Sequence, residues 1–185
     1  MDGRRRQILT EAALLFGRQG FERTSVRDIA AAVGMLPGSV YYYFPSKDAL
    51  LAAVYEDAID HMIAAIDAAT QAYSDPWDRL EAAATAHLRV LLGGGSIAAV
   101  VAGSPDEASS VRVELIRQRD RYEDVIRELT DAVTLPLGVE PASFRLALLG
   151  ALNWTLTWFR PDHGDGRTPD EIAQGLFAVF RAGRS

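Results

Sequence analysis

The sequence of 185 residues predicts an all-α protein of about nine helices. Three observations favour this fold class. Apolar residues recur every three or four positions along most of the chain, which is the helical period. Helix-start and helix-stop residues delimit these segments. No segment keeps the apolar–polar alternation of a β-strand over a convincing length. The helices are expected to form an N-terminal three-helix domain over residues 1–48 and a C-terminal helical bundle over residues 49–185.

The helix starts are marked by N-cap residues, several followed by proline or by an acidic residue three positions later. These starts are Ser25, Ser46, Asp75, Ser104 and Thr168. Glycines mark the stops, because glycine adopts the left-handed conformation that ends many helices. These stops are Gly20, Gly34, Gly93–Gly95 and Gly138. The segment 93–103 has the weakest pattern and is expected to hold a break and a short helix.

Charge is distributed unevenly along the chain, whose net charge is −6. Residues 1–52 contain seven basic and five acidic side chains, whereas residues 53–185 contain twelve basic and twenty acidic ones. Binding to a polyanion is largely electrostatic. A mildly basic head on an acidic body is therefore expected if only the head meets a nucleic acid.

The composition excludes several kinds of functional site. The absence of cysteine excludes disulfide frameworks, zinc ribbons, iron–sulfur ligation and cysteine nucleophiles. Lys47 is the only lysine and follows Ser46, so no phosphate-binding P-loop is present. The three histidines are too scattered to form a metal motif. We therefore expect no enzyme, no metal site and no cofactor.

No targeting or membrane segment is expected. The N-terminus is polar and is not followed by the apolar core of a signal peptide. The longest apolar stretch, residues 144–159, is too short and too polar to span ~30 Å of hydrocarbon. The sequence therefore predicts a cytoplasmic protein.

The segment 24–44 has the pattern of a helix-turn-helix. A short helix over residues 26–33 ends at Gly34, and a second one begins at about Pro37. Gly38 and Ser39 near the start of the second helix would permit a close approach to bases and phosphates. Ser25 and Lys47 stand at the starts of flanking helices, where backbone N–H groups favour a phosphate.

Three consecutive tyrosines follow in the second helix. Consecutive helical residues point about 100° apart, so Tyr41, Tyr42 and Tyr43 cannot all face a core. At least one must be exposed, and an exposed tyrosine beside Ser39 suits DNA contact better than packing. Arg4–Arg6 are open to two interpretations, a solvated tail or an arm that contacts DNA.

Residues 4–51 resemble the DNA-binding domain of TetR-family repressors. The matching positions are Ile8, Ala12, Phe16, Gly20, Phe21, Thr24–Val26, Ile29, Ala30, Val33, Gly34, Gly38–Tyr41, Phe44 and Ser46–Leu50. The resemblance implies DNA contacts at Ser25, Arg27, Gly38, Ser39, Tyr41, Tyr42, Tyr43 and Lys47. It implies phosphate contacts for Tyr41 and Lys47, and positions nearest the bases for Ser39 and Tyr42. The chain departs from the family at Leu36–Pro37, where polar residues are frequent, so fewer base hydrogen bonds are available.

The C-terminal bundle is expected to form a homodimer. The segment 144–159 is apolar on nearly all sides, and so is the last helix. A helix that is apolar on two faces must be covered on both, most simply by a two-fold partner. The predicted interface consists of Gly150, Ala151, Trp154, Trp158, Ala173 and Phe177. A fully central helix within the monomer is the alternative.

The same bundle is expected to bind a small hydrophobic effector. The candidate ligand-binding residues are Met62, Ile66, Leu88, Leu91, Arg117, Tyr122, Ile126, Leu148 and Leu152. A structural core is the competing interpretation of the apolar members. The segment 150–161 and the Thr168–Pro169 helix that follows resemble a branch of the family that controls lipid, sterol and aromatic catabolism. That resemblance implies an acyl-CoA thioester as the effector class.

The sequence thus predicts a ligand-responsive repressor that binds palindromic operator DNA as a homodimer. Its partners would be double-stranded DNA, a second copy of the chain and the effector, and no membrane. Two other functions stay open. One is an interaction protein whose helix-turn-helix no longer binds DNA, and the other is an enzyme on an all-α scaffold. A gel-shift assay would separate the first of these from the repressor.

Overall fold

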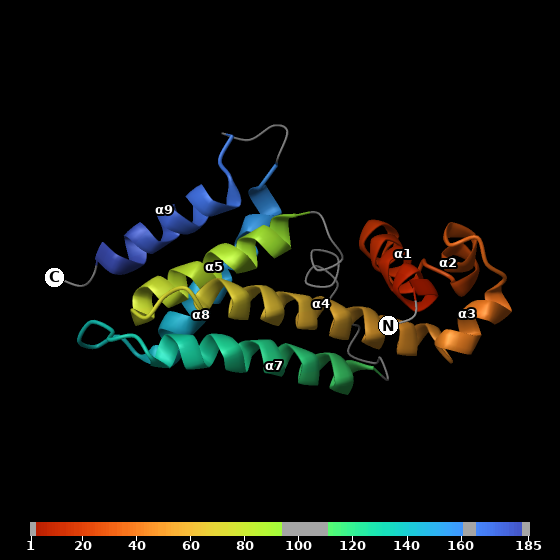
Figure 1. The fold of residues 1–185 in the computed structure, drawn as a ribbon, viewed down its shortest axis with the longest axis horizontal. Coiled ribbons are helices and arrows are strands. Elements are labelled where there is room, and N and C mark those ends of the chain that lie inside the picture. Colours follow the sequence, from red (N-terminus) through yellow and green to blue (C-terminus); the bar gives the residue numbers. More distant parts are fainter. Residues whose placement is uncertain (1–2, 94–110, 161–165, 183–185) are drawn as a thin grey trace. The chain divides into compact units, whose positions relative to one another are not determined.

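The computed structural model describes residues 3–93, 111–160 and 166–182. The fold class is confirmed, because these residues form eight helices and no strand (Figure 1). The helices are α1 (Gly3–Gln19), α2 (Val26–Ala32), α3 (Pro37–Tyr43), α4 (Lys47–Thr70), α5 (Pro76–Leu92), α7 (Arg112–Asp131), α8 (Pro141–Trp158) and α9 (Pro169–Ala182). The predicted helix start at Ser104 and the predicted break after Gly93 lie outside the described residues.

The predicted helix starts are confirmed in hydrogen-bond detail. Ser25 and Asp28 form a reciprocal capping box at α2, in which Ser25 N donates to Asp28 Oδ2 at 2.8 Å and Asp28 N to Ser25 Oγ at 3.2 Å. Thr168 and Glu171 form the same arrangement at α9. Each box satisfies two backbone donors that the first turn of a helix leaves without partners.

The chain separates into two compact units. Of the described residues, one unit contains 3–60 and 111–120, and the other contains 61–93, 121–160 and 166–182. In the first unit, α1 packs on α2 and α2 packs on α3. Its core includes the fully buried Ile8, Ala12 and Ile29. These three residues belong to the apolar pattern that predicted the helices.

In the second unit, α5 packs against α8 and, over more of its length, against α9. The Phe144 ring contacts Trp77 at 5.8 Å and Phe180 at 5.5 Å between centroids, both edge to face. Arg181 closes the outer side by ion pairs to Asp78 at 2.8 Å and Glu81 at 3.0 Å. The aromatic contacts of Phe144 therefore join α8 to both α5 and α9, and the ion pairs of Arg181 join α9 to α5.

Within the described residues, no helix is both long enough and apolar enough to cross a membrane. α8 comes from the most apolar stretch of the sequence, yet its exposed side chains include Thr157 and its half-buried ones include Arg145 and Asn153.

Candidate nucleic-acid interface and candidate pocket

The two short helices of the first unit are joined by a tight turn at Gly34. This glycine has φ +65°, a conformation that an L side chain rarely adopts. Gly34 N donates to Ala31 O at 3.1 Å and Met35 N donates to Ala30 O at 2.8 Å, so the turn satisfies two carbonyls at the end of α2. The turn thereby positions α3 as the second helix of a helix-turn-helix.

α3 buries one side and exposes the other. Val40 is its buried residue, and Phe44 directly after the helix is buried as well. Tyr42 is 85% exposed and Tyr41 is 49% exposed, whereas Tyr43 is half-buried. The prediction that not all three tyrosines face inward is therefore confirmed.

The exposed side of α3 combines small and aromatic residues. Gly38 and Ser39 are exposed, and a Cβ placed on Gly38 would meet no atom within 4 Å. The Tyr42 ring lies edge to face on Tyr43, with 5.3 Å between centroids. This contact restrains an otherwise exposed ring, so the ordering cost on binding a partner is reduced.

The flanking predicted contacts, Ser25, Arg27 and Lys47, differ in how available they are. Arg27 is exposed. Ser25 is exposed but its hydroxyl also donates to Asp28 at 2.7 Å, and these bonds hold the pKa of the Asp28 carboxyl below its usual value. The Lys47 ammonium donates to Phe21 O at 2.9 Å and lies 4.1 Å from the centre of the Phe21 ring. A phosphate contact by Lys47 stays a prediction.

The three N-terminal arginines do not form a loose tail. They belong to the first turns of α1, which begins at Gly3. Arg4 donates to Gln7 at 2.9 Å, and the half-buried Arg5 places its guanidinium 5.1 Å from the centre of the Phe44 ring. Of the two interpretations, a tail does not describe these residues, because they belong to a helix, although Arg4 and Arg6 are exposed. A contact between these arginines and DNA stays a prediction.

Of the candidate effector residues, eight lie in the second unit and Arg117 lies in the first. The eight are all buried: Met62, Ile66, Leu88, Leu91, Tyr122, Ile126, Leu148 and Leu152. Arg117 is exposed and makes a two-point ion pair with Glu114, at 2.6 and 3.0 Å. The eight buried candidates therefore lie in the core of the second unit, and Arg117 does not belong to that core.

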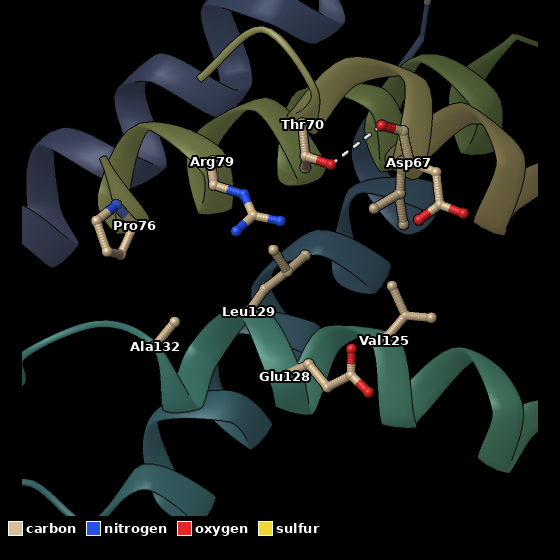
Figure 2. A pocket seen from close by; sticks show the side chains of 9 residues that line it. Asp67, Thr70, Pro76, Arg79, Val125, Glu128, Leu129 and Ala132 are labelled. Carbon is tan, nitrogen blue, oxygen red and sulfur yellow. Dashed lines mark hydrogen bonds between the residues drawn. The ribbon is translucent and has the colours of Figure 1, made fainter. Parts of the chain in front are cut away.

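A small cavity of about 160 Å³ lies between α4, α5 and α7 in the second unit (Figure 2). Ile66 is the one predicted effector residue on its wall. The remaining lining residues are Asp67, Thr70, Pro76, Arg79, Val125, Glu128, Leu129 and Ala132. Figure 2 shows the Arg79 guanidinium reaching into the space from α5, with the Glu128 carboxylate on the α7 side. The lining is mixed in polarity and differs from the apolar pocket that the sequence predicts.

The core of the second unit contains a polar pair that sequence reasoning missed. His87 on α5 and Tyr122 on α7 are buried, and Tyr122 Oη lies 2.8 Å from His87 Nδ1. Burial lowers the pKa of His87 to about 4, partly offset by the side chain of Asn153, and burial raises the pKa of Tyr122. His87 is thus neutral near pH 7, and its Nδ1 shares a hydrogen bond with the Tyr122 hydroxyl whose direction is set by the imidazole tautomer. In the sequence, His87 directly precedes Leu88, a candidate effector residue. No pattern in the sequence indicated that His87 would pair with a residue of another helix.

The other ring nitrogen of His87, Nε2, is buried and makes no hydrogen bond within the described residues. A buried polar atom without a partner carries a desolvation cost. Nothing in the described part of the chain resembles a metal centre, since no group of three His, Asp or Glu side chains converges there.

α8 has one buried and one exposed apolar face. Phe144, Leu148 and Leu152 are buried, whereas Gly150 is exposed, Trp154 is 65% exposed and Trp158 is 42% exposed. The predicted division of this helix into two faces is therefore confirmed, with Ala151 half-buried at the boundary.

Two of the residues predicted to form the dimer interface lie in the core of the monomer instead. Ala173 and Phe177 on α9 are 0% and 1% exposed, and Phe177 packs edge to face on Phe180 at 6.1 Å. Side chains enclosed in the monomer core cannot contact a second copy, so the assignment of these two residues is corrected. Val179, which is 73% exposed, lies on the open side of α9 instead.

Family models match both parts of the chain. Residues 8–54 match the model described as bacterial regulatory proteins, tetR family. Residues 73–183, more than half of the chain, match the model described as tetracyclin repressor-like, C-terminal domain. The chain belongs to the TetR family. It is a transcriptional regulator of that family, and its helix-turn-helix lies in the segment that matches the N-terminal model.

Several known proteins resemble this regulator over nearly its whole length. HTH-type transcriptional repressor KstR2 of Rhodococcus jostii (strain RHA1) is 29% identical, and the match covers 98% of this chain and 91% of that protein. The superantigen PfiT has a crystal structure that is 32% identical, covering 97% of this chain and 96% of that one, with a TM-score of 0.77. AibR, solved in complex with isovaleryl coenzyme A and operator DNA, is 26% identical over 96% of this chain and 97% of that one, with a TM-score of 0.80.

Proposed function

We propose that this TetR-family regulator is a ligand-responsive repressor that binds palindromic operator DNA as a homodimer and is released by a small hydrophobic effector. The observation that carries the proposal is the exposed side of α3, where Tyr42 is 85% exposed next to the open backbone at Gly38. Aromatic faces, a hydroxyl and accessible backbone are the groups that contact DNA. Since the proposed target is DNA, the protein would act in the cytoplasm.

The proposed DNA contacts keep the residues predicted from the sequence: Ser25, Arg27, Gly38, Ser39, Tyr41, Tyr42, Tyr43 and Lys47. Ser25, Arg27, Gly38, Ser39, Tyr41 and Tyr42 are exposed, and Tyr43 is half-buried. Lys47 would have to exchange its bond to Phe21 O for a phosphate oxygen. The relative AibR, crystallised with operator DNA, supports a nucleic-acid role for this architecture.

The homodimer is supported by the exposed apolar face of α8. Leu146, Gly150, Trp154 and Trp158 follow one another at a spacing of four residues, and the large side chains among them are 42–66% exposed. Large exposed apolar surfaces are uncommon on monomeric proteins. A Cβ on Gly150 would meet nothing within 4 Å, so this position allows a second helix to approach closely. Two copies joined here would present two recognition helices to the two halves of a palindrome.

The effector class proposed is an acyl-CoA thioester. AibR is solved with isovaleryl coenzyme A, and this chain resembles it over nearly its full length. The buried apolar set in the second unit would take the acyl group. The effector must bind the DNA-released state more tightly than the DNA-bound state, because a ligand with equal affinity for both states shifts nothing.

Binding to DNA is tested by fluorescence anisotropy with the full-length protein and a duplex from the region upstream of its own gene. A scrambled duplex of equal length is the control. We expect specific binding that weakens steeply with salt, since phosphate contacts release counterions. Equal affinity for both duplexes would refute the repressor function and favour an interaction protein with an inactive helix-turn-helix.

The effector class is tested separately by thermal-shift measurements with CoA thioesters of different acyl length and ring content. Ligand at about 100 times its dissociation constant should stabilise the protein by about 2.7 kcal/mol. Free CoA is the control for binding through the nucleotide alone. An effector of this class should also release the labelled duplex, and the absence of any shift across the series would refute the acyl-CoA assignment.

A further inference from the structure

The turn before α3 ends in an exposed leucine. Leu36 is 76% exposed and occupies the N-cap position of α3 with extended backbone angles, φ −77° and ψ 147°. Its side chain makes no capping hydrogen bond. N-cap positions strongly prefer Ser, Thr, Asp or Asn, so leucine contributes nothing to helix capping here.

The segment around Leu36 offers few polar groups. Pro37 has no N–H, and its ring is apolar. Two of the neighbouring backbone donors are already used, because Met35 N donates to Ala30 O at 2.8 Å and Ser39 N donates to Leu36 O at 2.9 Å. This end of α3 therefore presents an apolar surface made by the side chains of Leu36 and Pro37.

A single exposed leucine is ordinary on a protein surface. The position of this one is what distinguishes it. In a helix-turn-helix, the N-terminal residues of the second helix contact base edges in the major groove. The open backbone of Gly38 and the exposed rings of Tyr41 and Tyr42 follow within the same short helix, so Leu36 precedes the proposed DNA contacts directly in the chain.

The major groove presents one apolar group, the 5-methyl of thymine. Its other groups are hydrogen-bond donors and acceptors. The side chains of leucine and proline cannot form hydrogen bonds with them. We propose that Leu36 is a specificity-determining residue that contacts a thymine methyl group in each half-site of the operator. This inference rests on the proposed DNA-binding function and assigns a base preference to a residue outside the predicted contacts.

The inference is tested by removing only the methyl group. The probe is the duplex that the full-length protein binds most tightly from a randomised pool. Each symmetric pair of thymines in it is replaced by deoxyuridine, which keeps every hydrogen-bonding group. One pair should weaken binding by about 4-fold per half-site, the factor for burying a single methyl group.

The Leu36→Ala variant identifies the protein partner of that methyl. In this variant the same deoxyuridine pair should have no effect, because the contact is already lost. Leu137→Ala is the matched control, since Leu137 is fully exposed outside the helix-turn-helix and should leave the methyl effect unchanged. Circular dichroism should show native helix content in both variants, as neither leucine is buried.

The possible results separate this inference from the function on which it rests. If no deoxyuridine pair weakens binding, or if the effect persists in Leu36→Ala, Leu36 does not read a thymine methyl although the protein still binds its operator. If the pool yields no preferred duplex, the DNA-binding function itself fails, and this inference fails with it.

Discussion

Tyr42 is the residue whose surroundings suggest its role most directly. Its ring is exposed to solvent yet restrained by the edge-to-face contact with Tyr43. An aromatic side chain in this condition provides a large contact area at a small cost in conformational entropy. The neighbouring Val40 and Phe44 supply the core, so Tyr42 is not needed for folding.

We expect Tyr42→Ala to weaken specific operator binding by about 1–3 kcal/mol if the side chain contacts a base. Tyr42→Phe removes only the hydroxyl. It should retain the part of the binding free energy that is due to stacking and apolar contact of the ring. Anisotropy titrations with the operator duplex measure both variants. Tyr73→Ala is the matched control, because Tyr73 is 49% exposed in the other unit and should bind like the native protein.

His87 is the second residue with a consequence of its own. Its pKa in the folded protein is about 4, below the usual value of 6.5, mainly because of burial. The unfolded chain therefore binds a proton more readily than the folded one between these values. The stability due to a neutral His87 is complete above about pH 6.5 and is lost as the pH falls toward 4.

We predict that lowering the pH from about 7.5 to about 5 reduces the free energy of unfolding by roughly 2 kcal/mol through this residue. His87→Gln keeps a partner for Tyr122 Oη but does not titrate, so its stability should fall less over the same range. Urea unfolding at each pH provides the measurement. His61→Gln removes an exposed histidine and should retain the native pH dependence; equal slopes for His87→Gln and native protein would exclude His87 as the cause.

At the scale of elements, two glycines of the helix-turn-helix have different tasks. Gly34 has φ +65° and sets the turn, whereas Gly38 lies inside α3 with an ordinary backbone and open space around it. Backbone conformation constrains the first position, and proximity to DNA would constrain the second.

Gly34→Ala should therefore lower the free energy of unfolding by about 1 kcal/mol, because alanine is strained in the left-handed region. Gly38→Ala should leave stability unchanged or raise it slightly, since alanine favours helix. It should instead weaken operator binding, as its methyl group would occupy the surface proposed to approach DNA. Thermal unfolding and anisotropy on both variants give the comparison. Operator affinity of Gly38→Ala equal to that of the native protein would remove Gly38 from the proposed interface.

At the scale of the whole molecule, the exposed face of α8 is the feature that a single copy does not explain. Its large apolar side chains are open to solvent, while Arg145 and Asn153 on the same helix are half-buried. A second copy covering this face would remove the tryptophans from water, and burial of each large side chain is worth roughly 1.5–3 kcal/mol.

Trp154→Lys should therefore shift the protein toward a monomer, because a charge in the centre of an apolar interface is costly to desolvate. Sedimentation equilibrium measures the change, and operator affinity should fall with it, as one monomer holds one half-site. Leu137→Lys introduces the same charge at a fully exposed leucine and should remain dimeric. A dimeric Trp154→Lys would place the interface elsewhere.

Local patterns in the sequence were sufficient for the elements and for the helix-turn-helix. Ser25, Thr168 and Gly34 act through hydrogen bonds and backbone angles of their immediate neighbours, so their roles can be predicted from short stretches. The exposure of Tyr42 follows from the same local geometry, since three consecutive helical side chains must point in different directions.

Tertiary structure decided what depends on partners distant in the sequence. His87 and Tyr122 meet across 35 residues, and Ala173 and Phe177 are buried because α9 packs on α5. An apolar helix face has the same sequence pattern whether the core of the same chain or a second copy of the chain covers it. The sequence alone determined the fold class and the recognition helix because these follow from helical periodicity and turn geometry. Which apolar faces close the core and which stay open depends on packing between helices, which no local pattern encodes.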